Sequence, residues 1–261
     1  QRFLGGIPLV YSSVRIPSET WALPAVRRRG KQDIMARAGW EYLGRPSYLV
    51  NSYSKPELVL WTLGRYLGDE VMLQVMRTYF QLYRFKHPTT KDFIETVNEV
   101  ARRDMTWFFE ETFFSSQLVD YAIQSVSSSR IPERKGVFEE GKSGFSSLSQ
   151  EEEKIYQTEV VVQRLEGAKF PVEIMMVFEN GEKVRRRWDG QDRWKKFVVQ
   201  KSVALRYAVV DPERKLLLDI NPTNNSRYAK IPQGFALATW KWAGMWLFWI
   251  QNLLETFTFM A

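Results

Sequence analysis

Residues 51–70, NSYSKPELVLWTLGRYLGDE, contain the change from an irregular stretch to a strongly apolar helix. Pro56 suits the first turn of a helix, where its missing N–H has no partner to lose. Apolar and aromatic residues then recur at helical spacing, namely Leu58, Val59, Trp61, Thr62 and Tyr66. Gly68 is a typical helix end. The stretch predicts a helix from Pro56 to about residue 67, with Tyr53 and Lys55 just ahead of it.

Three more helices are predicted downstream of Gly68. Asp69 is expected to cap the second helix. Thr89 and Asp92 approximate a capping box at the start of the third. A fourth begins near Asp104 and carries the aromatic run Trp107, Phe108 and Phe109. We therefore predict a helical subdomain over residues 51–120.

The segment before these helices is predicted to be irregular. Glycines and prolines interrupt residues 1–50 repeatedly, and only residues 32–42 favour a short helix. The chain begins at Gln1 without an initiator methionine, so we expect a processed protein or part of a longer one.

From about Asp120 the apolar pattern changes to a period of two. The alternating stretch 170–178 is followed by Asn180-Gly181, which predicts a hairpin turn, and by a return strand. Further strands are predicted at residues 159–164, 195–200, 204–210 and 215–220. These short strands predict a small antiparallel β-sandwich over residues 157–230. Residues 121–156 favour a flexible connector or a long hairpin.

The last segment, residues 234–261, is rich in aromatic residues. Those that we expect at a membrane are Trp240, Trp242, Trp246, Phe248 and Trp249. About twenty residues from Trp242 onward match the length of a bilayer crossing, but Gln251, Asn252 and Glu255 form part of a polar stripe. Two membrane interpretations follow: a spanning helix with this stripe against a partner, or an interfacial helix with tryptophans at headgroup level. A core helix of a soluble protein is the third interpretation.

Composition limits the chemistry. The chain has 261 residues, no cysteine and one histidine, His87, which rules out thiolate chemistry and a multi-histidine zinc site. The net charge of +7 suits an anionic surface, either lipid headgroups or an acidic protein. We expect no nucleic-acid partner, because the basic runs at 27–29 and 185–187 match no nucleic-acid module.

An ordered set of motifs carries a resemblance to a known family. The set consists of Tyr53-Ser54-Lys55-Pro56, Leu67-Gly68-Asp69-Glu70, Thr89-Thr90-Lys91-Asp92-Phe93, and Asp104 with Trp107-Phe108-Phe109. It resembles the second half of the catalytic domain of the gluzincin zinc aminopeptidases, the aminopeptidase N type, in their bacterial membrane-associated members. Trp188-Asp189-Gly190 and residues 219–225 resemble the sandwich domain that follows.

The resemblance implies an α+β fold and a role for one residue. The fold would be the helical half of a thermolysin-like catalytic domain, then a small antiparallel β-sandwich and a C-terminal aromatic membrane helix. Tyr53 matches the tyrosine whose hydroxyl helps to stabilise the oxyanion, and Lys55 matches the motif lysine. The alternative for the chain as given, which lacks the zinc-binding half, is that Tyr53 is only a structural residue at the start of the helix.

The departures from the family concern the metal. The H-E-x-x-H helix and the G-x-M-E-N loop are absent, and Ser54 and Pro56 replace the family's Glu and Gly. His87 lies in a Lys-His-Pro turn and is expected to be an ordinary turn histidine. We therefore expect no metal ligands and no cofactor in this chain, zinc being implied only for a complete family member, and no catalysis by the chain alone.

Three hypotheses follow for function. The chain is either the C-terminal portion of a membrane-anchored zinc aminopeptidase, completed by a missing N-terminal half, or a non-catalytic relative that serves as an accessory subunit of a larger membrane protein complex. Both imply membrane lipid as a partner, and the resemblance implies a body on the periplasmic side of a bacterial inner membrane. The third is a soluble peptide- or carbohydrate-binding sandwich with Trp188 and Trp194 as a platform.

Overall fold

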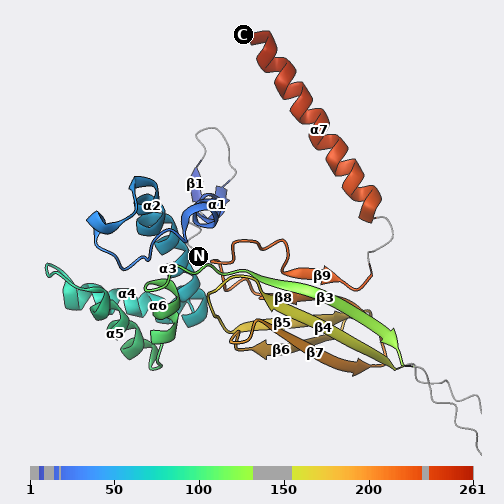
Figure 1. Ribbon diagram of the computed structural model, residues 1–261, viewed down its shortest axis with the longest axis horizontal. Coiled ribbons are helices and arrows are strands. Elements are labelled where there is room, and N and C mark those ends of the chain that lie inside the picture. Colours follow the sequence, from blue (N-terminus) through green and yellow to red (C-terminus); the bar gives the residue numbers. More distant parts are fainter. Residues whose placement is uncertain (1–5, 9–14, 18, 132–154, 231–234, 261) are drawn as a thin grey trace, which may run out of the picture.

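The computed structural model describes residues 6–8, 15–17, 19–131, 155–230 and 235–260. Figure 1 shows helices at one end of the body, a β-sandwich at the other, and a long C-terminal helix that runs away from the sandwich. The chain has a mixed α+β fold with antiparallel sheets, as the sequence predicts.

The first fifty residues contain more regular structure than predicted. Strands β1 (Gly6–Pro8) and β2 (Arg15–Pro17) pair antiparallel, and helix α1 (Glu19–Arg29) follows. α1 includes Pro24, which weakens a helix interior. Its Val26 is fully buried in the core, so tertiary packing stabilises a helix that local propensity does not favour.

The helix predicted over residues 32–42 does not form. This stretch instead contains a single 3₁₀ turn, η1 (Gly39–Glu41), followed by the short helix α2 (Arg45–Leu49). The cause is the buried Asp33, whose carboxylate accepts a hydrogen bond from the Leu43 N–H at 3.0 Å. Such side-chain to backbone bonds compete with helical ones.

The helical subdomain follows the predicted order. Its four main helices are α3 (Lys55–Leu67), α4 (Asp69–Tyr83), α5 (Thr90–Ala101) and α6 (Thr106–Thr112). Gly68 separates the first two with φ 90°, a value that glycine adopts without strain. Asp69 does not cap α4, because Gly68 holds that position and Asp69 is already helical. The capping box of Thr89 and Asp92 is confirmed: each backbone N–H donates to the other's side chain.

Two antiparallel sheets form the sandwich. One has the strand order β3-β4-β7, and the other has the order β6-β5-β8-β9. Their bounds are β3 (Tyr121–Arg130), β4 (Tyr156–Arg164), β5 (Val172–Phe178), β6 (Lys183–Trp188), β7 (Trp194–Lys201), β8 (Leu205–Val210) and β9 (Ser226–Tyr228). The predicted hairpin between β5 and β6 turns at Gly181, with φ 85°.

The strand predictions differ from the structure at residues 215–220. Residues 121–130 belong to β3, which pairs antiparallel with β4, and this is the pairing of the long-hairpin alternative for residues 121–156. Most of the segment between them lies outside the described residues. Residues 215–220 form turns instead of a strand, because the Asp211 carboxylate accepts hydrogen bonds from the N–H groups of Lys215 and Leu216.

One continuous core joins the helices to the sandwich. Phe170, just before β5, lies with its ring against Trp107 and Phe108 of α6, with ring centroids 5.7 Å apart in both pairs. Its backbone N–H and C=O both bond to the Tyr121 hydroxyl, at 2.9 Å and 2.8 Å. Tyr66 of α3 donates its hydroxyl to the carbonyl of Pro171 at 2.8 Å. These contacts hold α6 and the end of α3 against the sandwich.

Helix α7 (Phe235–Met260) confirms that the C-terminal segment is helical. Among the residues that the structure describes, no helix is long and apolar enough to cross a membrane. The membrane-spanning interpretation is therefore unsupported.

Candidate functional site

A wide helical turn sets the positions of Tyr53 and Lys55. In this turn, η2 (Val50–Ser54), the Lys55 N–H donates to the carbonyl five residues back, before the regular helix α3 begins. Pro56 follows and supplies no N–H, so the ordinary helical pattern is interrupted here. Single wide turns of this kind often occur at functional sites. Tyr53 ends 62 % exposed, whereas Lys55 is only 2 % exposed.

Tyr48 supports Tyr53 from the preceding helix. The two rings stand edge to face with centroids 6.2 Å apart, and Tyr48 packs in the same way on Tyr42 at 5.4 Å. Tyr42 is held in turn by a 2.9 Å hydrogen bond from its hydroxyl to the carbonyl of Met35. A hydrogen bond with Tyr53 raises the pKa of the Tyr48 phenol, and the neighbouring phenol charges add to the effect.

The geometry of the pair restricts the ring of Tyr53 while its phenol stays exposed. The arrangement presents one phenol O–H to the outside from a braced ring.

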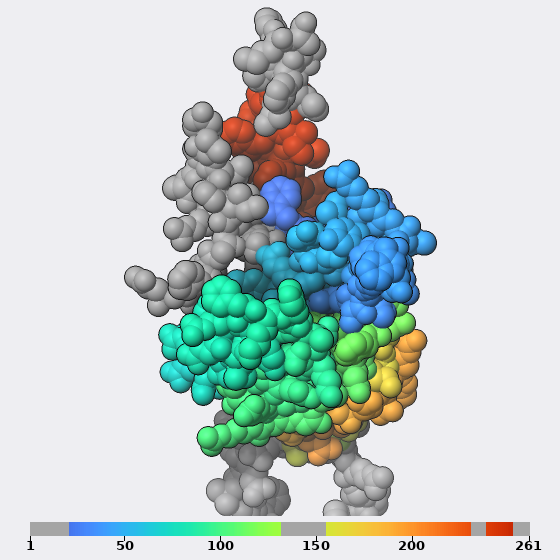
Figure 2. Space-filling model, turned by 90° about the vertical axis from the view of Figure 1, so that its left-hand side faces the viewer, coloured from blue at the N-terminus to red at the C-terminus, as the bar shows by residue number. Residues whose placement is uncertain are grey.

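Five large side chains between residues 40 and 53 are exposed, and we call them the aromatic ledge: Trp40, Leu43, Tyr48, Leu49 and Tyr53. Figure 2 shows this end of the molecule, where the blue residues before about 50 stand beside the teal and green helices. A group of exposed apolar side chains of this size is typical of an interaction surface.

The buried carboxylate of Asp33 holds the loop that carries the ledge. It accepts hydrogen bonds from the Ser47 hydroxyl, the Leu43 N–H and the Arg37 guanidinium. Burial alone would raise the pKa of Asp33, but these hydrogen bonds and the Arg37 charge outweigh burial and lower it. Asn51, at the start of the wide turn, donates to the Ser47 carbonyl at 3.1 Å and so ties the loop to the site.

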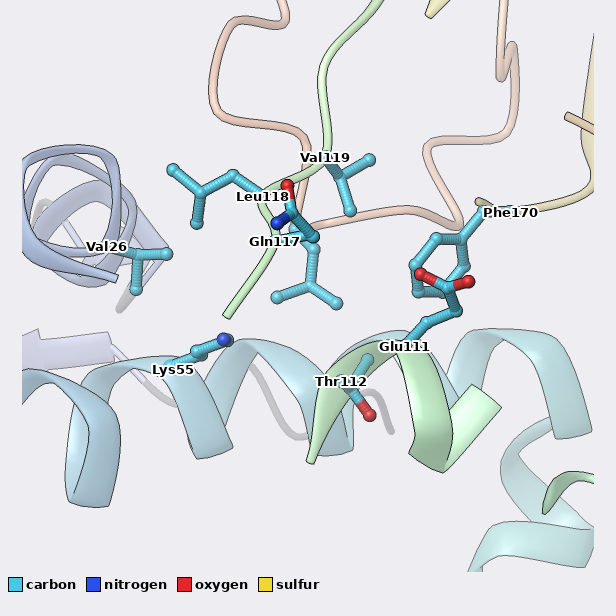
Figure 3. A pocket seen from close by; sticks show the side chains of 9 residues that line it. Val26, Lys55, Glu111, Thr112, Gln117, Leu118, Val119 and Phe170 are labelled. Carbon is cyan, nitrogen blue, oxygen red and sulfur yellow. The ribbon is translucent and has the colours of Figure 1, made fainter. Parts of the chain in front are cut away.

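Lys55 points the opposite way, into the core. Figure 3 shows its side chain directed from the start of α3 toward the segment that carries Gln117 and Leu118. It lines a cavity of about 10 Å³, also bordered by Glu111. The ammonium donates to the carbonyl of Ser115 at 3.2 Å, and within the described part of the chain no ion pair to it is found. Burial lowers the pKa of Lys55 to about 8.

A second buried titratable cluster lies where the helical subdomain meets the sandwich. Asp219 accepts hydrogen bonds from the Asn221 N–H, the Asn225 amide and the Tyr121 N–H, at 3.0–3.3 Å. Burial raises its pKa to about 6, and the nearby Asp120 charge adds to the rise. These bonds have a structural function, because they connect the chain entering β3 to the chain leaving β8.

The described residues do not fit a zinc ion. They contain no group of three or more His, Cys, Asp or Glu side chains that could hold a metal. His87, the one histidine of the sequence, is exposed in the turn before α5. In the described part of the chain, the structure therefore gathers no set of three such ligands around Tyr53.

Two other sequence-derived candidates do not form sites. Trp188 is fully buried in the sandwich, whereas Trp194 is 59 % exposed, so they do not form a shared platform. Trp188 ends β6 and packs edge to face on the buried Tyr121, with ring centroids 5.5 Å apart, which makes it part of the core. In the basic run, Arg185 forms ion pairs with Glu173 and Glu213 on the sheet surface.

Sequence reasoning missed Tyr48, the burial of Lys55 and the role of Asp33. The spacing of the tyrosines is a usable signal for the first, because Tyr48 lies about one helical turn before Tyr53. The direction of Lys55 depends on the wide turn, which no local pattern identifies. The partners of Asp33 are 10 and 14 residues away in sequence.

No protein-family model and no curated protein matches the chain. Among solved structures the chain is similar to aminopeptidase A of Legionella pneumophila in complex with aspartic acid, at 13% identity and a TM-score of 0.45. The match covers 78% of this chain and 23% of that chain. A likeness at this TM-score supports no further argument, and the proposals below rest on the residues.

Proposed function

We propose that this chain is the C-terminal portion of a membrane-anchored zinc aminopeptidase-like protein and that it is catalytically incompetent alone. Its role would be to supply the phenol donor Tyr53 to a site completed by a separate metal-binding half. The observation that carries the proposal is the outward, braced position of Tyr53 at the start of α3.

The geometry supports a donor role for Tyr53. Its phenol is 62 % exposed while its ring leans on Tyr48, so the hydroxyl is accessible and its position is restricted. No hydrogen bond from the Tyr53 hydroxyl to a described residue other than Tyr48 is found, so this hydroxyl could donate to a developing oxyanion. A positioned donor of this kind contributes about 3 kcal/mol to catalysis.

The incompetence of the chain alone is also part of the proposal. Hydrolysis by the route of the resembling family needs a metal ion that activates water. The sequence has one histidine and no H-E-x-x-H motif, and the described residues do not gather a ligand set. We therefore propose that any zinc is held by a half that these 261 residues do not include.

The test is a substitution in the longest product of the gene. If that product carries H-E-x-x-H and cleaves aminoacyl substrates, Tyr53→Phe should lower kcat about 10²–10³-fold with little change in KM. Tyr79→Phe, which removes a hydroxyl from α4, is the matched control and should leave kcat unchanged. An unaltered kcat in Tyr53→Phe would contradict the proposed role.

Membrane association through α7 is a further part of the proposal. Its four tryptophans are 62–78% exposed, which is costly in water and typical of a membrane interface. We propose that α7 lies in the interfacial region of a bilayer. By the family resemblance, the body would face the periplasm at a bacterial inner membrane.

A specific observation favours the alternative function, an accessory subunit of a membrane protein complex. On α4 the side chains of Leu73, Met76 and Phe80 are exposed at spacings that put them on one face. This apolar face lies outside the aromatic ledge and fits a protein partner. Migration of the chain as a free monomer from membranes solubilised in mild detergent would argue against this alternative.

A further inference from the structure

The middle of α7, from Trp242 to Ile250, has apolar side chains on all its sides. From Trp242 to Ile250 every residue is nonpolar, and successive residues are about 100° apart around the helix axis. The large side chains in this stretch are all exposed: Trp242, Met245, Trp246, Leu247, Phe248, Trp249 and Ile250. Tryptophans next to a lysine and followed by aliphatic residues fit the headgroup level and acyl boundary of a bilayer, where an interfacial helix lies. Lipid is therefore the occupant that fits this segment.

The charges that precede this segment have a single sign, whereas Glu255 follows it five residues after Ile250. Between Ser226 and Asn252 the sequence contains three cations and no Asp or Glu. Of the three, Arg227 donates to the carbonyl of Gln124 at the edge of the sandwich. Lys230 and Lys241 are both exposed, one just after β9 and the other within α7.

Lys241 is well placed to contact a headgroup. It lies between Trp240 and Trp242, which are 78% and 62% exposed. Tryptophan rings prefer the headgroup level of a bilayer, and a lysine stem can reach from that level to the phosphates. Figure 1 shows α7 leaving the body beyond β9, so Lys230 comes before the helix and Lys241 is in its early part.

We propose that α7 and Lys230 dock on a leaflet that contains anionic phospholipid, with Lys230 and Lys241 contacting the headgroup phosphates and the stretch from Trp242 to Ile250 in the acyl boundary. This inference rests on the proposed membrane association and adds the lipid class and the residues that select it. Positive charge next to an exposed apolar helix is the combination that binds acidic membranes.

The expected contribution of the lysines can be stated as a change in affinity. A lysine at an anionic surface strengthens binding about fivefold, which corresponds to ~1 kcal/mol. Replacing both Lys230 and Lys241 with Gln should therefore weaken binding to anionic vesicles about thirtyfold at low salt. Binding to neutral vesicles should hardly change.

The experiment is co-sedimentation of the full chain with vesicles of phosphatidylcholine alone or with about a third phosphatidylglycerol. The chain should bind both and prefer the anionic vesicles, and added salt should reduce the preference. The matched control is Lys183→Gln with Lys195→Gln, which removes two exposed lysines from the sandwich. This control should keep the preference for anionic vesicles, which the variant with Gln at both Lys230 and Lys241 should lose.

Two results would overturn the inference in distinguishable ways. Equal binding to both vesicle types, or an equal loss of binding in the control variant, would overturn the inferred selectivity for anionic headgroups. Either result would leave the proposed membrane association intact. No binding to either vesicle type would overturn membrane association itself and would favour a protein as the occupant of α7. Trp246→Ser should weaken binding to both vesicle types if the helix is embedded at all.

Discussion

The substitution Lys55→Met tests the description of the core beneath the site. The lysine is 2 % exposed, and its ammonium has one hydrogen-bond acceptor, the carbonyl of Ser115. Because burial lowers its pKa from 10.5 to about 8, the charged form reduces the free energy of unfolding by about 3 kcal/mol at neutral pH. Methionine has a similar length and removes the charge.

The net effect of Lys55→Met is a difference of two contributions. Removing the charge stabilises the fold by about 3 kcal/mol, while leaving the Ser115 carbonyl without its donor costs about 1–2 kcal/mol. We expect the variant to gain about 1–2 kcal/mol at pH 7, or about 3–6 °C in Tm.

The pH dependence of this gain has a definite sign. Below about pH 8 the lysine is charged in both the folded and the unfolded wild type, so the full cost of burial is present. Above about pH 8 the folded form loses its proton first, and wild-type stability rises with pH toward 10.5. The advantage of Lys55→Met should therefore shrink and vanish by about pH 10.

Urea unfolding followed by tryptophan fluorescence at pH 7 and pH 9.5 measures both effects. Lys91→Met, on the exposed side of α5, is the control and should change stability by less than about 0.5 kcal/mol at either pH. A loss of stability in Lys55→Met at pH 7 that is independent of pH would refute the reasoning, since it would mean that the native ammonium is well paired.

Three further predictions concern the phenol pair, the buried acid and the sandwich. Tyr53→Phe should lower the pKa of Tyr48 toward its usual value, because the hydrogen bond that raises it is lost; absorbance at 295 nm measures this, and an unchanged Tyr48 titration would contradict the pair. Because the pKa of Asp219 is raised, the free energy of unfolding of the wild type relative to Asp219→Asn should fall by about 3 kcal/mol as the pH rises from about 4 to about 6.5. A difference in unfolding free energy that does not change with pH in urea unfolding would contradict this. Arg164→Met should cost about 3–4 kcal/mol, because the buried guanidinium donates to four backbone carbonyls at 2.8–3.3 Å, whereas the exposed Arg193→Met should cost far less in the same assay.

Local patterns predicted most of the regular structure from residue 55 onward. α3 begins near Pro56 because proline is tolerated there, and the capping box at Thr89 fixes the start of α5. The Asn180-Gly181 pair identifies the hairpin of β5 and β6, because Asn-Gly favours a tight hairpin turn. In each case the decisive interactions lie within a few residues of one another.

The misses depend on contacts between residues distant in sequence. α1 forms around Pro24 because the helix is packed into the core, and the loop after it follows the hydrogen bonds of Asp33. The role of Tyr53 stays a prediction from its motif, and the packing of Tyr48 against it was not predicted. The inward direction of Lys55 results from a wide turn that sequence periodicity does not reveal.

The most direct test of the central claim is a turnover measurement on the isolated chain. The chain would be incubated with Zn²⁺ and aminoacyl 4-nitroanilides, and release of nitroaniline followed against a protein-free blank. The proposed absence of metal ligands around Tyr53 predicts no release above the blank at any zinc concentration that keeps the protein soluble. Zinc-dependent release that is abolished in Tyr53→Phe would contradict the account.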